Sequence, residues 1–189
     1  MIRGILLAAG ASTRMGRDKL LLPWRGSTVL ATTLAAWSAV AELESILLVR
    51  RGDEPWDQWP RVRVIANRDA DEGMGSSLRV GVQALPLDTE AAVVGLADMP
   101  EVATSTIRTL IEAWRPLGPG GIVAPLHEGK RGHPVVFGAA YFPALRALRG
   151  DQGARSILQE NGGKLSLVAV DDPGVLVDLD TPADVESRR

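Results

Sequence analysis

A loop near the start of the chain carries the residues with the clearest chemical potential. Residues 7–19 read Leu-Ala-Ala-Gly-Ala-Ser-Thr-Arg-Met-Gly-Arg-Asp-Lys, a small-residue stretch with two glycines. Small side chains let the backbone approach phosphate oxygens, which exposed N–H groups can then bind. Arg14 can grip two such oxygens at once, and Lys19 can add a compact positive charge. The loop therefore predicts an anion site, with a plain strand-to-helix turn that carries two solvated cations as the alternative.

The spacing of this loop separates it from two better-known phosphate-binding motifs. Gly10 and Gly16 are followed by Arg17, Asp18 and Lys19, which fits neither G-x-x-x-x-G-K-[ST] nor G-x-G-x-x-G. A kinase-type P-loop and a dinucleotide-dependent oxidoreductase both lose support.

A second candidate is Asp98, which follows the apolar run of residues 91–97. That run has no polar alternation, as expected for a strand covered on both faces. Ligands of open α/β sheets gather at the carboxyl ends of the strands, so Asp98 is expected to face the same crevice as the opening loop. A carboxylate there can hold Mg²⁺ together with substrate phosphates. The alternative is a structural role, either as a cap of the helix that begins near Thr104 or in the turn before Pro100.

A third candidate is the pair Asp178 and Asp180, near the end of the chain. If residues 175–179 form a strand, the period-two spacing places both carboxylates on one face. Asp180 is then the preferred second metal ligand and Asp178 the other choice. Ordinary helix capping by Asp180 or Thr181, with Asp184 near the helix dipole, is the alternative.

The bulk composition is that of one globular α/β domain. The chain has 189 residues, is 46% hydrophobic and 23% charged, and has a formal net charge of -2. This size predicts a single domain over residues 1–189, and the charge gives no general attraction to nucleic acid or to an anionic membrane. The absence of cysteine excludes disulfides and thiolate metal sites and fits the cytoplasm. The apolar start is too short for a leader or a membrane span, so it predicts a first buried strand.

Alternating strand and helix patterns predict how these residues are positioned. Helical patterns cover residues 28–41, 76–85 and 104–114. Such alternation implies a three-layer, Rossmann-like α/β fold with a mostly parallel central sheet. Residues 1–117 are expected to form a nucleotide-binding half. Residues 118–189 are expected to add mixed or edge strands and to form the half that binds the acceptor. The predicted strands are residues 5–9, 45–50, 62–66, 91–97, 121–125, 134–137, 165–170 and 175–179.

Taken in order, these segments resemble the MobA-like nucleotidyltransferases, and most closely the molybdenum cofactor cytidylyltransferases. The likeness spans nearly the whole chain and is more specific than any single motif. It rests on residues 7–19, Asn67 with residues 72–78, residues 96–100, 131–137, 150–155 and 178–184.

The resemblance implies a role for each candidate residue. The triphosphate would be bound by Gly10, Ala11, Arg14 and Lys19. Asp98 would coordinate Mg²⁺, with a further contact from Asp180 or Asp178. The base and ribose would lie against Leu7, Ala8, Ala9, Gly73 and Ser77. His133 is similar in setting to an acceptor-side residue of the family, although a polar residue in a tight turn is an equal interpretation. For Arg155, acceptor binding competes with simple solvation on a helix surface.

The activity implied by the resemblance is transfer of CMP from CTP to a molybdopterin-type acceptor, with release of pyrophosphate. Relatives that use GTP have Leu-Ala-Gly-Gly where this chain has Leu7-Ala8-Ala9-Gly10. The extra methyl of Ala9 narrows the space for a base, in agreement with CTP, although one methyl discriminates only modestly. Two alternatives remain. One is transfer from a nucleoside triphosphate, which can be CTP, to a different phosphorylated small molecule. The other is a non-catalytic partner that binds the finished cofactor for a molybdenum hydroxylase.

Overall fold

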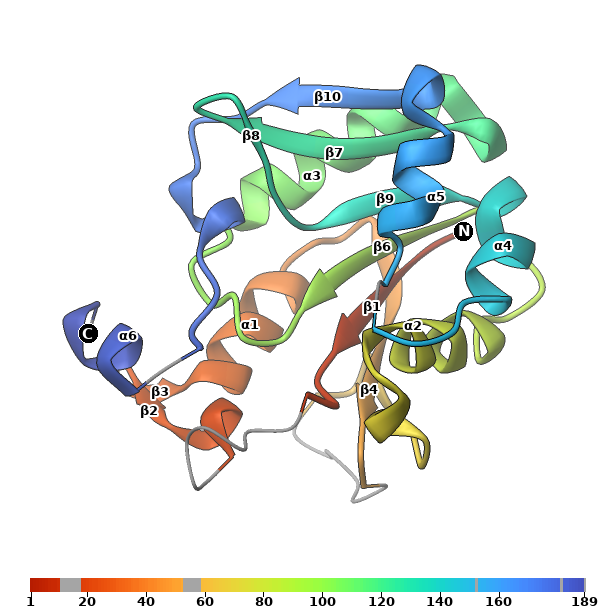
Figure 1. Ribbon diagram of the computed structural model, residues 1–189. Coiled ribbons are helices and arrows are strands. Elements are labelled where there is room, and N and C mark those ends of the chain that lie inside the picture. Colours follow the sequence, from red (N-terminus) through yellow and green to blue (C-terminus); the bar gives the residue numbers. More distant parts are fainter. Residues whose placement is uncertain (11–17, 53–58, 152, 181, 189) are drawn as a thin grey trace.

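A twisted, mostly parallel sheet runs through the middle of the molecule (Figure 1). The computed structural model describes the chain except for residues 11–17, 53–58, 152, 181 and 189. Within the described residues the strands follow one another across the sheet as β10 (Leu165–Ala169), β7 (Ile122–His127), β9 (Val135–Gly138), β6 (Ala91–Leu96), β1 (Ile2–Leu7), β4 (Leu43–Arg50) and β5 (Val62–Ala66). A short β8 (Lys130–Arg131) pairs with β7, and β2 (Pro23–Trp24) and β3 (Ser27–Thr28) form a separate ribbon.

Strand direction divides the sheet into two parts. The four neighbours β6, β1, β4 and β5 are parallel, as are β7 and β10. Strand β9 is antiparallel to both β6 and β7 and joins the two parts. Of the mixed or edge strands expected from the second half, β9 is a mixed strand buried inside the sheet, and β10 lies at its edge.

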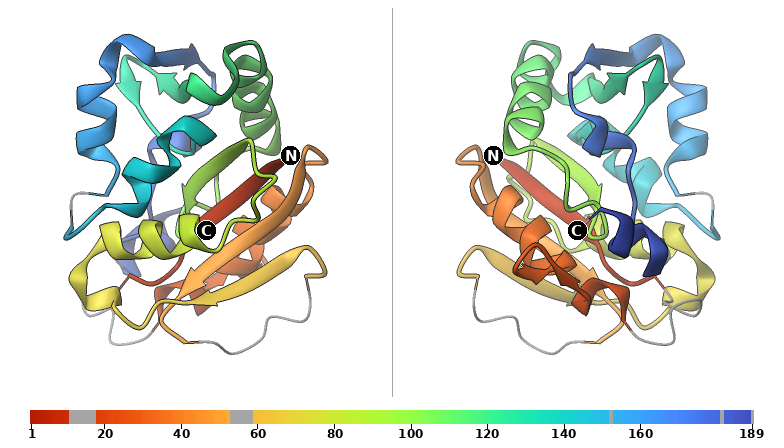
Figure 2. Two further views of the ribbon diagram at one scale, coloured as in Figure 1. Left: turned by 90° about the vertical axis from the view of Figure 1, so that its right-hand side faces the viewer. Right: turned by 90° about the vertical axis from the view of Figure 1, so that its left-hand side faces the viewer.

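Helices cover both faces of the sheet and complete three layers (Figure 2). One face packs against α1 (Val29–Ser38) and α3 (Thr104–Trp114), and the C-terminal α6 (Pro182–Ser187) adds Val185 to the same core. The other packs against α2 (Met74–Gln83), α4 (Phe142–Arg146) and α5 (Arg155–Glu160). Alternate strand residues feed the two cores, as Leu6 and Ile5 of β1 do. The predicted three-layer Rossmann-like fold is confirmed.

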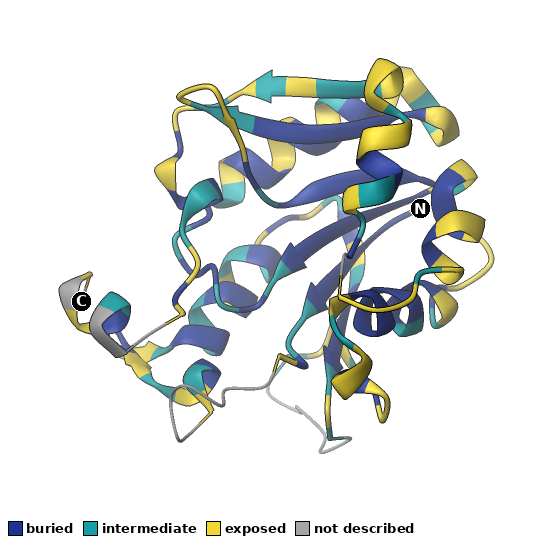
Figure 3. Ribbon diagram, in the orientation of Figure 1, coloured by how far each residue is buried: buried dark blue, intermediate teal, exposed yellow. Residues whose placement is uncertain are grey.

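The central strands are buried on both sides, which explains their apolar sequences (Figure 3). In β6, residues Ala91, Ala92, Val93 and Val94 are all buried, because helices cover both of its faces. Among the described residues, no helix is both long and apolar enough to cross a membrane.

One predicted strand is absent. In place of a strand over residues 175–179, the chain forms a 3₁₀ turn at Pro173–Leu176 and then an irregular stretch. The buried carboxylate of Asp172 sets this turn, since it accepts hydrogen bonds from the N–H groups of Gly174 and Ala103 at 3.0 Å. The apolar side chains of Val175 and Leu179 reach the interior without strand pairing. Apolar spacing alone therefore gave the wrong structure here.

The topology creates a crevice at the carboxyl ends of β1 and β6. From β1 the chain passes through α1 to β4 on one side, whereas β6 lies on the other side of β1. Connections that leave in opposite directions open a gap above the strand ends, where ligands of such folds bind.

Candidate active site

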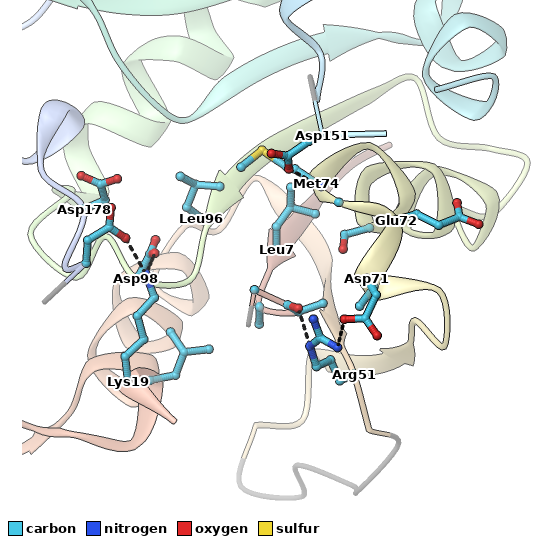
Figure 4. Close-up of a pocket in the computed structure, with 18 residues that line it drawn as sticks. Leu7, Lys19, Arg51, Asp71, Glu72, Met74, Leu96, Asp98, Asp151 and Asp178 are labelled. Carbon is cyan, nitrogen blue, oxygen red and sulfur yellow. Dashed lines mark hydrogen bonds and ion pairs between the residues drawn. The ribbon is translucent and has the colours of Figure 1, made fainter. Parts of the chain in front are cut away.

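A cleft of about 640 Å³ opens at this crevice (Figure 4). Strands β1 and β6 pair in parallel and end together, with Leu7 opposite Leu96, so the segments that follow them leave at the same edge. Both leucines line the floor of the cleft. The full lining is Leu7, Ala8, Ala9, Gly10, Lys19, Leu20, Arg51, Ala70, Asp71, Glu72, Gly73, Met74, Ser77, Leu96, Asp98, Asp151, Asp178 and Asp180.

One side of the cleft, the charged wall, consists of Lys19, Asp98 and Asp178 (Figure 4) together with Asp180, which contacts Lys19. The Lys19 Nζ lies 2.6 Å from Asp98 Oδ2 and 2.9 Å from Asp180 Oδ1. The side chains of Lys19 and Asp98 are each only 16% exposed, whereas that of Asp180 is 52% exposed. Three segments far apart in sequence thus meet around one ammonium group.

Local structure fixes each member of the charged wall. Lys19 opens a 3₁₀ turn in which the N–H of Leu20 donates to the Asp18 carboxylate at 3.0 Å. Asp98 lies two residues beyond the end of β6. The irregular stretch near the C-terminus is held to it, because the N–H of Leu179 donates to the Asp98 carbonyl at 3.1 Å. Since Leu179 is fully buried, its neighbours Asp178 and Asp180 stay at the cleft.

The structural alternatives for these acids can now be compared with the contacts. Helix α3 has no side-chain cap from its N-cap residue Ala103, and Asp172 accepts the N–H of Ala103. Asp98 therefore does not cap α3. The carboxylate of Asp184, which was expected only to lie near the helix dipole, accepts the Asp180 N–H at 3.2 Å and so has a structural role at the start of α6.

Burial and charge shift the protonation equilibria of the charged wall. Burial raises the pKa of Asp98 above its ordinary value, Lys19 opposes that rise, and the charge of Asp178 adds to it. For Lys19, burial acts to lower the pKa, but Asp98 and Asp180 outweigh burial and hold the pKa above its ordinary value. At neutral pH Lys19 is therefore protonated, and its ammonium group contacts the carboxylates of Asp98 and Asp180.

The Asp98 carboxylate is suited to a further cation. Its Oδ1 is buried and has no hydrogen-bond partner in the described part of the chain. Burying such an oxygen without a partner is costly, so a bound cation would relieve it. No group of three His, Cys, Asp or Glu side chains among the described residues is arranged to hold a metal by itself. The donor set therefore fits an ion that takes its other ligands from substrate oxygens and water, as Mg²⁺ commonly does.

The opposite side of the cleft, the α2 wall, consists of Met74 and Asp151 (Figure 4) together with Gly73, the residue before α2, and Ser77 of α2. Gly73 has a φ of 105°, and an added Cβ would lie 2.7 Å from the Asp151 Cα. Only glycine combines that backbone angle with so close a contact. The Asp151 carboxylate also accepts the Met74 N–H at 3.3 Å, so a segment of the second half is attached to the start of α2.

A buried amide supports the α2 wall from behind. Asn67, which is 1% exposed, donates from Nδ2 to Ser76 Oγ at 2.9 Å and to Ser77 Oγ at 3.0 Å. Its Oδ1 accepts the Asp69 N–H at 3.0 Å. Such a fully bonded network holds the turn between β5 and α2 in one shape.

The remaining predicted residues are not all at the cleft. Leu7, Ala8, Ala9, Gly10, Gly73 and Ser77 line it. Ala11 and Arg14 lie outside the described residues. Neither His133 nor Arg155 lines the cleft. Arg155 is exposed at the start of α5, whereas the Nδ1 of His133 is buried without a hydrogen-bond partner in the described structure. Burial and the nearby Arg131 lower the pKa of His133, against the opposing charges of Asp98 and Asp178.

Sequence reasoning assigned no role to several residues that line the cleft, notably Arg51, Asp71 and Asp151. Arg51 follows the end of β4, donates from Nε to the Ala9 carbonyl at 3.0 Å, and pairs with Asp71 at 2.8 Å. Its place just after a parallel strand was the available signal, because that edge of the sheet is where ligands bind. Asp151 had no such signal, since it belongs to a glycine-rich turn distant in sequence.

Comparison with known proteins agrees with this geometry. The family described as MobA-like NTP transferase domain matches residues 4–165, a range that includes Lys19 and Asp98 but ends before Asp178 and Asp180. The purine catabolism protein PucB of Bacillus subtilis is 29% identical, over 98% of this chain and 95% of its own. Nicotine blue oxidoreductase of Paenarthrobacter nicotinovorans is 32% identical, over 95% and 92%. The molybdenum cofactor cytidylyltransferase of Escherichia coli is 30% identical, over 95% and 91%.

Solved structures give the same result. The crystal structure of Rv0371c from Mycobacterium tuberculosis has a TM-score of 0.83 and 29% identity, and the match covers 98% of this chain and 96% of that one. The same protein has also been solved in complex with manganese, with a TM-score of 0.77 and coverage of 99% and 97%. The chain therefore belongs to the MobA-like NTP transferase family, a family of nucleotidyltransferases.

Proposed function

We propose that this protein transfers CMP from CTP to the terminal phosphate of a molybdopterin-type acceptor and releases pyrophosphate. The observation that carries the proposal is the charged wall, in which Lys19, Asp98 and Asp180 meet at the edge of a cleft of about 640 Å³. A nucleotidyltransferase needs a cation for phosphate charge and carboxylates for a metal at one place. The charged wall offers both.

In this proposal the triphosphate binds to the opening loop and to Lys19. Gly10, Ala11 and Arg14 contribute to the same site, although Ala11 and Arg14 lie outside the described residues. The base and ribose lie between Leu7, Ala8 and Ala9 on one side and Gly73 and Ser77 on the other. The second half of the chain binds the acceptor, with His133 and Arg155 as candidate contacts.

Asp98, with Asp180 or Asp178, would hold Mg²⁺. The unpaired Oδ1 of Asp98 supports this assignment, as does the manganese complex of the mycobacterial relative. When bound, the metal would supply charge neutralisation at the phosphates and orient them for displacement.

The chemistry needs no nucleophile from the protein. An oxygen of the acceptor phosphate attacks the α-phosphorus, and a new P–O bond forms. The bond from the α-phosphorus to the oxygen that bridges to the β-phosphorus breaks, and its electron pair leaves with pyrophosphate. Lys19, together with Arg14, stabilises the charge that builds up on this leaving group. The protein therefore contributes positioning and charge.

The choice of CTP is supported by Ala9. This residue lines the cleft, is only 3% exposed, and its carbonyl accepts a hydrogen bond from Arg51, so its backbone is held in place there. A cytidylyltransferase from Escherichia coli matches at 30% identity, and a guanylyltransferase from Rhodobacter capsulatus matches at 28%. These two sequence identities are too similar to distinguish CTP from GTP as the donor. The preference for CTP therefore rests on the methyl group of Ala9.

Names of other relatives define the rival functions. PucB is named for purine catabolism, and the Paenarthrobacter relative is named an oxidoreductase of nicotine blue. Transfer to another phosphorylated acceptor would still release pyrophosphate, but with a different product. A reductase would instead consume a reduced cofactor without cleaving a triphosphate. A non-catalytic partner of a molybdenum hydroxylase would bind the finished cofactor and cleave nothing.

One experiment separates these possibilities. The purified chain is incubated with Mg²⁺, molybdopterin and each of CTP, GTP, ATP and UTP, and products are identified by mass together with released pyrophosphate. We expect a cytosine dinucleotide form of the acceptor and one pyrophosphate per product, with CTP the preferred donor. A product from GTP but not from CTP would overturn the base assignment. No pyrophosphate with any donor would overturn the transferase proposal for this acceptor.

A further inference from the structure

The Lys19 ammonium occupies the centre of the charged wall. It lies within 2.9 Å of an oxygen of both Asp98 and Asp180, and it is mostly buried. Lys19 therefore bridges the two carboxylates that the proposed function assigns to a metal ion.

The charges around it are unequal. Lys19 brings one positive charge, whereas Asp98, Asp178 and Asp180 together bring more negative charge than one ammonium can neutralise. Asp178 is near enough for its charge to raise the pKa of Asp98. The second oxygen of Asp98 stays without a hydrogen-bond partner among the described residues. Lys19 therefore neutralises only part of the negative charge of the charged wall.

We propose that the Lys19 ammonium occupies the cation position between Asp98 and Asp180 when no nucleotide is bound. A divalent cation replaces it at these carboxylates only when a triphosphate is also present to bind the ammonium. This inference rests on the proposed function, because it concerns the same metal and nucleotide site.

The physical reason is the cost of taking charged partners away from a mostly buried charge. A divalent cation that arrives alone must compete with the Lys19 ammonium for Asp98 and Asp180, and the ammonium loses both of these ion pairs, which is unfavourable for a group with a 16% exposed side chain. Triphosphate oxygens give that ammonium new partners in the same step. Metal and nucleotide therefore bind with positive coupling, and the coupling is the same from either direction.

The coupling can be measured without turnover, with Mn²⁺ as the metal and CTP as the nucleotide. Mn²⁺ affinity in the absence of nucleotide is measured from the EPR signal of free Mn²⁺. CTP affinity is measured by calorimetry, with metal removed by EDTA and again with saturating Mn²⁺. For the wild-type chain we expect weak Mn²⁺ binding alone and a gain in CTP affinity of about 10-fold or more with Mn²⁺, within the usual range of coupling.

The decisive variant is Lys19→Met, which keeps the length of the side chain and removes its charge. It should bind Mn²⁺ alone about 10-fold more tightly than wild type, and Mn²⁺ should raise its CTP affinity by a smaller factor. Lys164→Met is the matched control, because Lys164 is an exposed lysine outside the cleft. It should behave as wild type in both measurements.

Three outcomes would overturn the inference. They are equal Mn²⁺ affinity in Lys19→Met and wild type, weaker binding in the variant, or wild-type CTP affinity that does not respond to Mn²⁺. The last needs no variant, so the inference stays testable if Lys19→Met does not fold, and Lys19→Gln offers a second substitution. Failure of the proposed acceptor would appear separately, as coupled Mn²⁺ and CTP binding without transfer of CMP to molybdopterin.

Discussion

The two walls of the cleft are built on different principles. The charged wall is an assembly of side chains, Lys19 with Asp98 and Asp180, whose contacts are ion pairs between distant segments. The α2 wall rests on close backbone packing, in which Gly73 of the wall and Gly75, two residues further along α2, leave no room for a Cβ against Asp151 and Gly150. Charge that can change partners suits a reacting group, whereas close backbone packing suits a surface that must keep its shape. Substitutions in the charged wall should therefore mainly affect activity, and substitutions that crowd the backbone contacts behind the α2 wall should mainly affect stability.

The largest effect is expected at Asp98. Asp98→Ala should lower CMP transfer by about 100-fold or more, because it removes the buried carboxylate assigned to the metal, and loss of one charge-stabilising group commonly costs that much. Pyrophosphate release measures the effect. The fold should persist, since Lys19 keeps its contact with Asp180.

The control for this prediction is Asp171→Ala, which removes an exposed carboxylate outside the cleft and should leave the rate unchanged. Wild-type turnover by Asp98→Ala would contradict a chemical role for Asp98 and, with it, the proposed difference between the two walls.

A second, smaller effect on activity is expected at Lys19. Lys19→Ala should slow transfer by about 10- to 100-fold, because the leaving pyrophosphate loses one of its proposed cationic partners. Circular dichroism should show a native spectrum. Single-turnover kinetics at saturating CTP separate this loss from weaker nucleotide binding. An unchanged rate at saturation would limit Lys19 to binding.

The backbone packing that supports the α2 wall should respond in stability. In Gly75→Ala the new Cβ would lie 2.6 Å from the Gly150 carbonyl oxygen, to which the Gly75 N–H donates at 2.9 Å. Alanine favours a helix over glycine by about 1 kcal/mol, but a clash with backbone has no cheap relief. We expect a net destabilisation of about 1–3 kcal/mol, measured by urea unfolding.

Gly162→Ala is the matched control, because nothing lies within 4 Å of its added Cβ. Its stability should stay within about 0.5 kcal/mol of wild type. Equal stability of the two variants would mean that the contact between α2 and the turn before α5 does not hold the wall in shape.

The smallest effect concerns pH. The pKa of Asp98 is raised in the folded protein above its ordinary value of 3.8, chiefly by burial. Its contribution to stability is therefore fully present below pH 3.8 and is lost as pH rises through the folded pKa. Asn cannot ionise, so Asp98→Asn should gain stability relative to wild type as pH rises from 3 to 7. Unfolding midpoints at both pH values give this difference, and a constant difference would contradict the assigned cause.

Much of the fold could be predicted from sequence, because its central strands are buried on both faces. Residues 62–66 and 104–114 match β5 and α3 at both ends, since apolar runs and turn residues mark such elements locally. The same reasoning gave a strand at residues 175–179 and was wrong. In this segment the backbone N–H groups of Gly174 and Leu179 donate to the Asp172 carboxylate and to the Asp98 carbonyl, and not to a neighbouring strand.

Sequence by itself also identified Lys19, Asp98 and the two C-terminal acids as residues able to do chemistry, because their types and their places after glycine-rich or apolar runs are local properties. Only the tertiary structure decided that Lys19 and Asp180, 161 positions apart, come within 2.9 Å of each other. It also placed Asp151 against the start of α2 and left His133 and Arg155 outside the lining of the cleft. The physical reason is that strand order and long-range packing determine which strand ends and turns become neighbours, and neither is encoded in the spacing of any one motif.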